Sequence, residues 1–389
     1  MVMQLVAPRL MLMGGGSVAK LAEVLAQLGL SRPLVVTDPF MVSSGMVERA
    51  LSPLRAAGLS FAVFSDTVPD PTDTVIEAGV AVLKSGSYDC LVGFGGGSPM
   101  DTAKAMAILA AAPPGTHIRA FKVPAAANTG AVPVICVPTT AGTGSEATRF
   151  TVITDTTSDE KMLIAGLGAL PLAAVVDHEL TFSLPARITA DTGIDSLTHA
   201  LEAFVSKRAN AVSDDYARSA MRLIAPNLRR VWADPADATA REAMMRGATL
   251  AGLAFSNASV ALVHGMSRPV GAHFHVPHGL SNAMLLPAVT AFGLEEGRAR
   301  YAEAARVMGV ATEQEGDQSA AQRLVEELRA LNHDLQVPTP AGWGIDADKW
   351  NGLLPTMAQQ ALASGSPGNN PRVPDADQIV ALYREAYGR

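Results

Sequence analysis

The chain has 389 residues, which is more than a typical single hydrophobic core accommodates and therefore predicts two domains. Hydrophobic residues make up 48% of the sequence and charged residues 17%, a balance that excludes a disordered chain. The net charge is −7 and no run of lysine or arginine interrupts the sequence. A nucleic-acid partner is therefore not expected, because phosphate binding needs a basic surface.

The two cysteines, Cys90 and Cys136, lie in apolar, strand-like runs. They are too few for a disulfide framework or a four-cysteine zinc site, and their setting is typical of reduced, buried thiols in a cytoplasmic protein. The apolar N-terminus lacks the charged region and cleavage site of a signal peptide. No uninterrupted apolar stretch approaches the ~18 residues of a membrane span. We therefore expect a cytoplasmic protein with no membrane partner.

Short β-branched runs alternate with helical stretches in the first half of the chain. The predicted strands are 33–37, 61–64, 90–94, 132–137 and 173–177. The helical stretches between them include 18–28, 75–83 and 102–111. This alternation predicts βαβ units and a mainly parallel sheet with both faces covered.

The sequence changes character near residues 184–185. Beyond this point, alanine-, leucine- and arginine-rich segments with helical periodicity dominate, including 194–205, 214–224, 240–254 and 320–331. No convincing strand follows. We therefore predict an α/β domain over residues 1–184 and an all-helical domain over 185–389, with a surface loop at 364–374 before a last helix.

A first glycine-rich loop, GGGSPMD at 95–101, follows the strand at 90–94 and opens a helix. Ser98 suits an N-cap and Pro99 the first helical position, with Asp101 three residues after the cap, as in a capping box. Glycines let a diphosphate approach the backbone, and a helix N-terminus offers unpaired N–H groups. A glycine triplet also serves an ordinary tight turn, so this loop alone is a weak predictor of nucleotide binding.

A second loop, PTTAGTGSE at 138–146, follows the next strong strand and consists mostly of residues that hydrogen-bond phosphates or ribose. Ligands of open α/β sheets bind at the carboxyl ends of the strands, so the two loops together predict a nucleotide site. Asp38, directly after the strand at 33–37, could accept hydrogen bonds from an adenosine ribose and repel a 2′-phosphate, favouring NAD over NADP. It could equally cap a helix or turn before Pro39.

Asp195 and His199 stand one helical turn apart, and Glu202 continues the same stripe, so the first two side chains can converge on one point. Such a pair is also common on solvated helices. The segment 264–279 then holds four of the chain's eight histidines, which are His264, His273, His275 and His278. Carboxylate and imidazole are ligands that divalent transition metals accept. Composition alone does not choose among the four histidines.

Four motifs occur in one order: GGGSPMDTAK at 95–104, PTTAGTGSEAT at 138–148, TGIDSLTHALEAF at 192–204 and HGMSRPVGAHFHVPHG at 264–279. On these motifs the chain resembles the iron-containing (group III) alcohol dehydrogenases over its whole length. The resemblance implies a dehydroquinate synthase-like fold, with a dinucleotide-binding α/β domain, an all-α metal-binding domain and an active site in the cleft between them. It also implies a homodimer or larger assembly.

The resemblance implies a metal site and a cofactor site. The implied metal ligands are Asp195, His199, His264 and His278, with Fe²⁺ as the expected ion and Zn²⁺, Mn²⁺ or Ni²⁺ as alternatives. The implied cofactor contacts are Asp38, Gly96, Gly97, Ser98, Asp101, Thr139, Thr140 and Thr143. Lys161, in the Asp-Glu-Lys turn after the next strand, would bind the ribose beside the nicotinamide.

The implied reaction is hydride transfer between the nicotinamide C4 of NAD, or less favourably NADP, and a metal-bound small alcohol or aldehyde. Many family members carry a second histidine four residues after the third ligand, with a proton-relay role. Arg268 occupies that position here, and arginine does not titrate near neutral pH. His273 is then a candidate relay.

Arg268 also suggests a hydroxy-acid dehydrogenase or a hydroxyacid-oxoacid transhydrogenase, because a guanidinium can bind a substrate carboxylate bidentately. Arg149 could add to such a site. The alternative is that either arginine pairs with a structural carboxylate such as Glu146 or Glu202. A dehydroquinate synthase-type lyase and a non-catalytic metal- or nucleotide-binding protein are two further alternatives, and the intact motifs favour the dehydrogenase over both.

Overall fold

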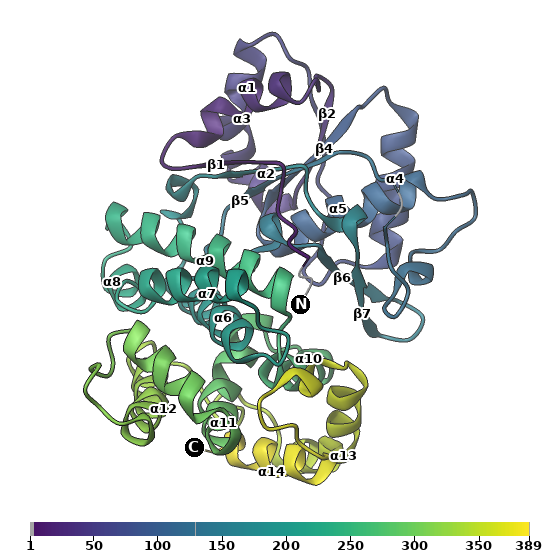
Figure 1. The fold of residues 1–389 in the computed structure, drawn as a ribbon. Coiled ribbons are helices and arrows are strands. Elements are labelled where there is room, and N and C mark those ends of the chain that lie inside the picture. Colours follow the sequence, from purple (N-terminus) through teal and green to yellow (C-terminus); the bar gives the residue numbers. More distant parts are fainter. Residues whose placement is uncertain (1–3, 129, 389) are drawn as a thin grey trace. The chain divides into compact units, whose positions relative to one another are not determined.

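The structure, a computed structural model, describes residues 4–128 and 130–388. Two compact units divide the chain, one spanning Val6–Ser183 and the other continuing from Leu184 (Figure 1). Every strand of the described residues lies in the first unit, whereas the second contains only helices. The predicted combination of an α/β part and an all-α part is therefore confirmed.

Six parallel strands form the sheet of the first unit. In spatial order they are β1 (Leu10–Met13), β8 (Ala173–Val176), β5 (Val134–Pro138), β4 (Cys90–Gly95), β2 (Pro33–Val36) and β3 (Ala62–Phe64). Every residue of β2, β4, β5 and β8 is buried. Their almost continuous apolar sequences follow from this burial on both faces.

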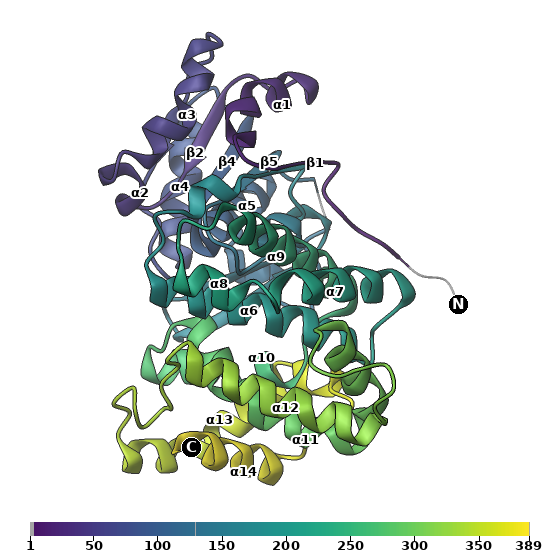
Figure 2. The same ribbon diagram turned by 90° about the vertical axis from the view of Figure 1, so that its left-hand side faces the viewer.

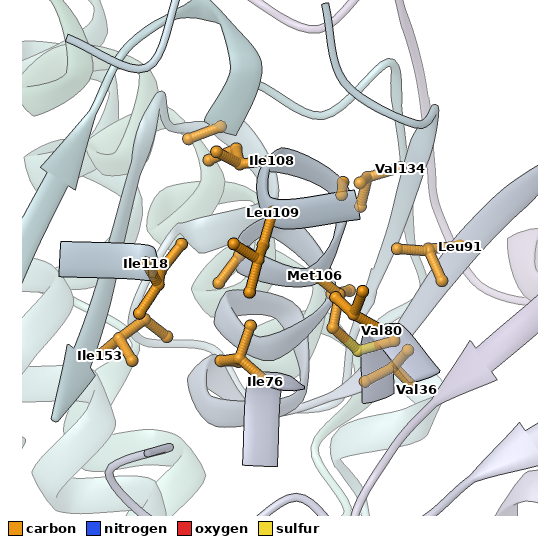
Figure 3. Close-up of a cluster of buried hydrophobic side chains, with 14 of the residues drawn as sticks. Val36, Ile76, Val80, Leu91, Met106, Ile108, Leu109, Ile118, Val134 and Ile153 are labelled. Carbon is orange, nitrogen blue, oxygen red and sulfur yellow. The ribbon is translucent and has the colours of Figure 1, made fainter. Parts of the chain in front are cut away.

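Helices cover both faces of the sheet. They are α1 (Leu21–Gln27), α2 (Pro39–Ser43), α3 (Met46–Ala56), α4 (Asp73–Ser85) and α5 (Gly97–Ala111). Successive strand side chains point to opposite faces, so Val35 and Val92 pack in a core with α1 and α3. Val36 and Leu91 belong to the core on the other face, where they pack with α4 and α5 around Met106 (Figure 3).

The connections of β2 and β4 leave these neighbouring strands in opposite directions. From β2 the chain passes through α2 and α3 to β3 at the sheet edge, whereas from β4 it passes through α5 to β5. In open α/β sheets, ligands bind outside the carboxyl ends of strands at such a reversal. Asp38 directly follows β2, and Gly96 directly follows β4. The topology thus brings two of the predicted cofactor segments to the same part of the sheet.

Three strands were not predicted from the sequence. β1 is a four-residue edge strand, and β6 (Phe150–Asp155) pairs with β7 (Glu160–Ala165) as an antiparallel hairpin. Burial alternates along β6, but its buried residues include Thr151 and Asp155, so the sequence lacks the apolar/polar alternation that identifies a strand. The placement of Lys161 in a turn was wrong, because the turn ends at Asp159 and Lys161 pairs with Thr154 within the hairpin.

The second unit is built from nine helices in the described residues. They are α6 (Ala186–Val205), α7 (Ala211–Ile224), α8 (Leu228–Ala233), α9 (Ala238–Ala258), α10 (Leu262–Phe274), α11 (His278–Val307), α12 (Asp317–Asp334), α13 (Ala347–Ala363) and α14 (Ala376–Tyr387). α6 packs against α7, α9 and α11, while α11 and α12 lie side by side (Figures 1 and 2). α14 is the predicted last helix.

Prolines interrupt the sequence patterns of three of these helices, namely Pro269 in α10, Pro287 in α11 and Pro355 in α13. A proline inside a helical pattern normally indicates a helix end. Each of these helices nevertheless continues past its proline, because packing against neighbouring helices stabilises it.

Short 3-10 helices complete the secondary structure. They are η1 (Ser17–Lys20), η2 (Ile118–Phe121), η3 (Ser145–Ala147), η4 (Leu167–Ala169), η5 (His178–Thr181) and η6 (Ser366–Asn369). No single helix of residues 4–128 and 130–388 has the length and apolar character of a membrane span, although α9 and α10, bent by 105°, meet the criteria of length and composition as a pair.

Candidate metal centre and cofactor loops

Helix α6 carries the first two predicted metal ligands. Asp195 and His199 lie one turn apart and are only 2% and 4% exposed. The helix is buried on nearly all sides from Thr189 to Val205, so this is not a pair on a solvated helix. A buried carboxylate beside a buried imidazole needs compensating partners, and the neighbouring helices supply them.

The other two predicted ligands lie at the beginnings of α10 and α11. His264 is in the first turn of α10, and His278 is the first residue of α11. Gly279 follows at a close approach of two helices, where a Cβ atom would lie 2.4 Å from the carbonyl oxygen of Asp191 in α6. The missing side chain therefore lets the start of α11 contact the helix that carries Asp195.

One ligand atom from each of Asp195, His199, His264 and His278 lies within 4.8 Å of the other three. The Nε2 atoms of His264, His278 and His199 are 3.6, 3.8 and 3.9 Å from Oδ1 of Asp195. A tetrahedral ion with bonds of ~2.1 Å holds its ligands ~3.4 Å apart. The four side chains therefore fit one divalent metal ion with small adjustments. His278 alone has an exposed side chain, at 40%.

Asn282 joins this cluster although the sequence analysis did not identify it. It lies one turn after His278, and its Nδ2 is 2.7 Å from Oδ1 of Asp195 and 3.1 and 3.3 Å from Nε2 of His264 and His278. Its Oδ1 is buried without a hydrogen-bond partner among the described residues. The i, i+4 spacing from a predicted ligand is the signal that could have found it.

Glu202 contacts the far side of His264. One carboxylate oxygen is 2.6 Å from Nδ1 of His264, and the other accepts a 2.6 Å hydrogen bond from the backbone N–H of Val263. Glu202 and His264 are each 3% exposed. The sequence placed Glu202 on the same stripe as Asp195 and His199 but assigned it no contact with a ligand.

The charges in this cluster shift the pKa values of its members. Burial acts to raise the pKa of Asp195, but the imidazoles of His199, His278 and His264 outweigh burial and hold it well below its usual range. Burial acts to lower the pKa of His264, but the carboxylates of Glu202 and Asp195 raise it to about 9. The site is thus built to hold positive charge beside a carboxylate.

His273 does not lie among these ligands. It stands nine residues after His264 on α10, which corresponds to ~13.5 Å of rise and to the opposite side of the helix. Its Nε2 is 2.8 Å from Oε1 of Gln360. The structure therefore gives the candidate proton relay no direct contact with the cluster.

Arg268 lies one turn after His264 and is half-buried. Its guanidinium donates a 3.3 Å hydrogen bond to Oγ of Ser366, and no carboxylate of the described residues comes within 4.0 Å of it to form an ion pair. The alternative of a direct ion pair with Glu146 or Glu202 is therefore not found for Arg268. Burial lowers the pKa of Arg268, an effect that the charge of Glu202 partly offsets.

The two predicted cofactor loops contact each other in the first unit. The N–H of Thr139 donates to the carbonyl of Gly95, and a Cβ atom at Gly97 would lie 2.9 Å from the side chain of Thr143. The hydroxyls of Thr139 and Thr140 are buried without a partner among residues 4–128 and 130–388. Unpartnered hydroxyls beside a glycine-rich turn fit a phosphate-bearing ligand.

The expected cap at the start of α5 was wrong. The helix begins at Gly97, Gly96 is its N-cap, and no side chain caps it. Ser98 and Pro99 therefore lie inside the first turn. The first turn keeps its backbone N–H groups free of a side-chain acceptor, which suits an anion at this end of the helix.

Asp101 binds the protein instead of completing a capping box. Its carboxylate accepts hydrogen bonds from Oγ of Ser145 and the backbone N–H of Val152. Burial raises its pKa, although the charge of Lys104 opposes the effect. Both oxygens of this predicted cofactor contact are thus used within the first unit.

Lys104, which the sequence analysis missed, is wholly buried below the second loop. Its ammonium is within 3.2 Å of oxygens of Ser145, Thr148 and Phe150. Burial lowers its pKa, and the charge of Asp101 partly restores it. Asp101 and Lys104 together fix the second loop to α5.

Asp38 and Lys161, the remaining predicted cofactor residues, both have partners in the protein. Asp38 caps α2 through a 2.9 Å hydrogen bond from the N–H of Met41 to Oδ1, as the alternative interpretation expected. Nζ of Lys161 lies 2.8 Å from Oδ1 of the exposed Asp70. These contacts leave Oδ2 of Asp38 outside the cap and Lys161 in a pair that solvent weakens.

The parallel sheet and the helical unit with its four-ligand cluster define an α/β plus all-α protein with a dehydroquinate synthase-like fold. The family profile described as iron-containing alcohol dehydrogenase matches residues 8–178, and the profile of the C-terminal part of the Fe-containing alcohol dehydrogenase family matches residues 189–387. The chain belongs to the iron-containing alcohol dehydrogenase family, whose members are oxidoreductases acting on CH–OH groups.

Two curated relatives illustrate the similarity. Lactaldehyde reductase of Escherichia coli (strain K12) is 36% identical over 374 residues, covering 96% of this chain and 97% of that protein. NAD-dependent methanol dehydrogenase of Bacillus methanolicus is 36% identical over 380 residues, covering 97% of this chain and 98% of that protein.

Solved structures extend the similarity to the fold. A 1,3-propanediol oxidoreductase matches with a TM-score of 0.94 at 35% identity, covering 100% of both chains. Sulfoacetaldehyde reductase from Bifidobacterium kashiwanohense in complex with NAD⁺ matches with a TM-score of 0.88 at 27% identity, covering 100% of this chain and 99% of that chain.

Proposed function

We propose that the protein is a metal-dependent NAD alcohol dehydrogenase and aldehyde reductase. The observation that carries this proposal is the convergence of ligand atoms from Asp195, His199, His264 and His278 within 4.8 Å of one another. One carboxylate and three imidazoles suit Fe²⁺, with Zn²⁺, Mn²⁺ and Ni²⁺ as alternatives. When bound, the ion supplies a Lewis acid that stabilises negative charge on the substrate oxygen.

The side chains of the cluster prepare this site before a substrate binds. Asp195 supplies the negative charge that offsets part of the ion's charge. His278, with the only exposed side chain of the four, lies where solvent and a small molecule can reach the cluster. The second unit, beginning near residue 185, is accordingly the metal-binding domain of the proposal.

The first unit, ending near residue 184, is the dinucleotide-binding domain of the proposal. The uncapped start of α5 at Gly96, Gly97 and Ser98 would hold the diphosphate, because its N–H groups and helix dipole favour an anion. The unpartnered hydroxyls of Thr139 and Thr140, with Thr143 beside them, would donate to phosphate or ribose oxygens. Asp101 would contribute by holding this loop in place.

NAD is favoured over NADP because Asp38 lies at the end of β2, where its second carboxylate oxygen could accept from the adenosine ribose and would repel a 2′-phosphate. Lys161 would bind the ribose beside the nicotinamide after leaving its exposed partner Asp70. The NAD named for the Bacillus methanolicus and Bifidobacterium relatives supports the same cofactor for this chain.

In the oxidative direction, hydride leaves the carbinol carbon for C4 of the nicotinamide, the hydroxyl proton passes to solvent, and the products are a carbonyl compound and NADH. Aldehyde reduction reverses these steps. Small alcohols and aldehydes are the proposed substrates, in line with the names of the lactaldehyde, methanol and propanediol relatives. We further propose that the protein is cytoplasmic. We also propose that it forms a homodimer or larger assembly, whose mass light scattering would measure.

The test is a metal-reconstitution assay. The protein is stripped with a chelator and loaded with Fe²⁺, Zn²⁺, Mn²⁺ or Ni²⁺. It is then assayed at 340 nm with short alcohols, diols and hydroxy acids in the presence of NAD or NADP, and with aldehydes in the presence of NADH or NADPH. We expect metal-dependent NADH formation with at least one alcohol. Turnover without metal, or bound metal and NAD without turnover of any substrate, would contradict the proposal, and a lyase reaction without net NADH would favour the dehydroquinate synthase-type alternative.

A second candidate is an anionic substrate, because the half-buried guanidinium of Arg268 has a hydrogen bond to Ser366 but no carboxylate partner within 4.0 Å in the described part of the chain. A guanidinium left without an ion pair near the cluster could bind a carboxylate or sulfonate. The solved relative named for sulfoacetaldehyde, an anionic aldehyde, agrees with this candidate. A hydroxy-acid dehydrogenase or a hydroxyacid-oxoacid transhydrogenase would use such a contact.

A further inference from the structure

The carboxylate of Glu202 contacts two groups at the start of α10, the backbone N–H of Val263 and the imidazole of His264. Oε1 accepts a hydrogen bond from the backbone N–H of Val263 at 2.6 Å, and Oε2 lies 2.6 Å from Nδ1 of His264. The two residues are neighbours at the start of α10, whereas Glu202 comes from α6. Because Glu202 and His264 are both buried, water does not replace either contact.

These contacts determine where His264 carries its proton. A backbone N–H can only donate, and an ionised carboxylate can only accept. A 2.6 Å contact between Oε2 and Nδ1 therefore requires a proton on Nδ1. In the neutral imidazole, Nε2 is then the atom with the free lone pair, and Nε2 is the atom that faces Oδ1 of Asp195 at 3.6 Å.

We propose that Glu202 is a positioning residue of the metal site, which fixes His264 in the Nδ1–H tautomer and so presents Nε2 to a divalent ion. The inference rests on the proposed metal site. A carboxylate that accepts from the distal nitrogen of a ligating imidazole also makes the ligating nitrogen more basic. Glu202 thus raises the affinity of the site for metal without itself touching the ion.

Two groups besides His264 interact favourably with the carboxylate of Glu202. Arg268, one turn after His264, interacts electrostatically with Glu202, although no ion pair forms within 4.0 Å. The N–H of Val263 adds a hydrogen bond to the second oxygen. These groups surround the buried carboxylate with donors and positive charge.

The decisive variant is Glu202→Gln, which keeps the size of the side chain but replaces one acceptor by a donor. If the amide oxygen accepts from the N–H of Val263, its NH₂ group faces Nδ1 of His264, and the neutral ring must then carry its proton on Nε2. If the amide turns over, two donors face each other at Val263. Glutamine therefore cannot satisfy both contacts of Glu202 while leaving Nε2 free.

The experiment measures Zn²⁺ affinity of chelator-stripped protein by competition with a chromophoric chelator. We expect Glu202→Gln to raise the Kd for Zn²⁺ by ~10–100-fold, the usual effect of removing such a partner. Glu303→Gln is the matched control, because Glu303 pairs with Arg218 at 2.7 Å and has no contact with the cluster in the structure. Circular dichroism of the stripped proteins checks that each variant is folded.

The outcomes separate this inference from the proposed function. Wild-type protein that binds no Zn²⁺, or binds it equally after His264→Ala, overturns the metal site and the inference together. Wild-type binding that depends on His264 but is unchanged in Glu202→Gln overturns the inference alone.

A wild-type measurement does not depend on the folding of the variant. In Zn²⁺-loaded protein labelled with ¹⁵N-histidine, His264 should show a hydrogen-bonded proton on Nδ1 and none on Nε2, with the signal assigned by its absence in His264→Asn. A proton on Nε2 of His264 would overturn the inference.

Discussion

The side-chain amide nitrogen of Asn282 lies 2.7 Å from Oδ1 of Asp195 and thereby links the first turns of α11 to the middle of α6. The same nitrogen is within 3.3 Å of Nε2 of His264 and His278. An amide has two N–H donors for these three acceptors. Asn282 can therefore donate to two of these three ligand atoms at a time, and it links α6 to the imidazoles of α10 and α11.

Replacing Asn282 by leucine, which is similar in size, should destabilise the metal-free protein. Oδ1 of Asp195 would lose a buried donor, at a cost of ~1–3 kcal/mol. The expected effect is a fall in Tm of about 2–10 °C in the presence of EDTA, measured by calorimetry. The exposed Asn351 of α13 provides the control variant Asn351→Leu. Equal Tm values for Asn282→Leu and wild type would show that Asp195 does not need this donor.

Removing one predicted ligand should remove the metal. In His264→Ala, metal content measured by plasma mass spectrometry should fall from about one ion per chain to well below one. Activity should fall by at least ~100-fold, because a Lewis acid supplies several kcal/mol of transition-state stabilisation. His273→Ala is the control, because His273 contacts Gln360 instead of the cluster. Full metal content in His264→Ala would be incompatible with the assignment.

Lys104→Met should destabilise the first unit and weaken NADH binding while leaving metal content unchanged. Asp101 would remain without its buried cation, and backbone carbonyls of Ser145, Thr148 and Phe150 would lose a donor. Each buried carbonyl left without a donor costs ~1–3 kcal/mol. Thermal unfolding and NADH fluorescence titration measure the two effects.

The exposed Lys84 at the end of α4 provides the control variant Lys84→Met, with an expected change within ~0.5 kcal/mol. Wild-type stability and NADH affinity in Lys104→Met would exclude a role for the ammonium in fixing the second loop.

Cys136 should be unreactive in the folded protein. Burial raises the pKa of its thiol to about 12, so the thiolate fraction at pH 8 is about one part in ten thousand. Burial also raises the pKa of Cys90 far above its usual range. Dithionitrobenzoate at pH 8 should therefore label neither thiol in native protein and both after denaturation, and rapid labelling of native protein would contradict this burial.

The raised pKa of Cys136 also predicts that the folded protein loses stability as the pH rises. The folded-state pKa of Cys136 is higher than the unfolded value of ~8.5, so the stabilising contribution of the neutral thiol is complete below ~8.5 and is lost as the pH rises towards about 12. The Tm of wild type should consequently fall more steeply than that of Cys136→Ala between pH 8.5 and pH 10.5. Parallel curves would show that Cys136 contributes nothing to this loss.

The proposed role of Arg268 predicts a preference for anionic over neutral substrates. If its guanidinium binds a carboxylate, kcat/KM for 4-hydroxybutyrate should exceed that for 1-butanol. Arg268→Met should then lower the value for 4-hydroxybutyrate by ~10–100-fold, the equivalent of a charge-assisted hydrogen bond, and leave 1-butanol unchanged. A preference for butanol that is the same in wild type and Arg268→Met would exclude the anion contact.

Local patterns in the sequence predicted most of the regular structure. Apolar runs such as 90–94 correspond to buried strands, because a parallel strand covered on both faces must be apolar throughout. The patterns failed where local chemistry and packing disagree. No helix was predicted over α11, which contains Pro287, and the short edge strand β1 has too few residues for a periodic signal. Ser98 resembled a cap, but the glycine before it takes that position.

The metal-ligand set illustrates a different limit. Spacing alone paired Asp195 with His199 but left four histidines in one segment undivided, and only the family resemblance selected His264 and His278. The structure brings these two together with the first pair, while His273 lies on the far side of α10. Helical rise and rotation decide this separation, but only once the helix is known to run through Pro269.

By itself the sequence determined the fold class, the family and the residue types of a metal and nucleotide site, because these depend on periodicity and on motifs that are contiguous in the chain. The tertiary structure alone decided which atoms meet. Glu202 reaches His264 across 62 positions, and Asn282 reaches Asp195 across 87. Such contacts depend on the packing of α6 against α10 and α11, and no local pattern encodes the hydrogen-bonding direction at a buried imidazole.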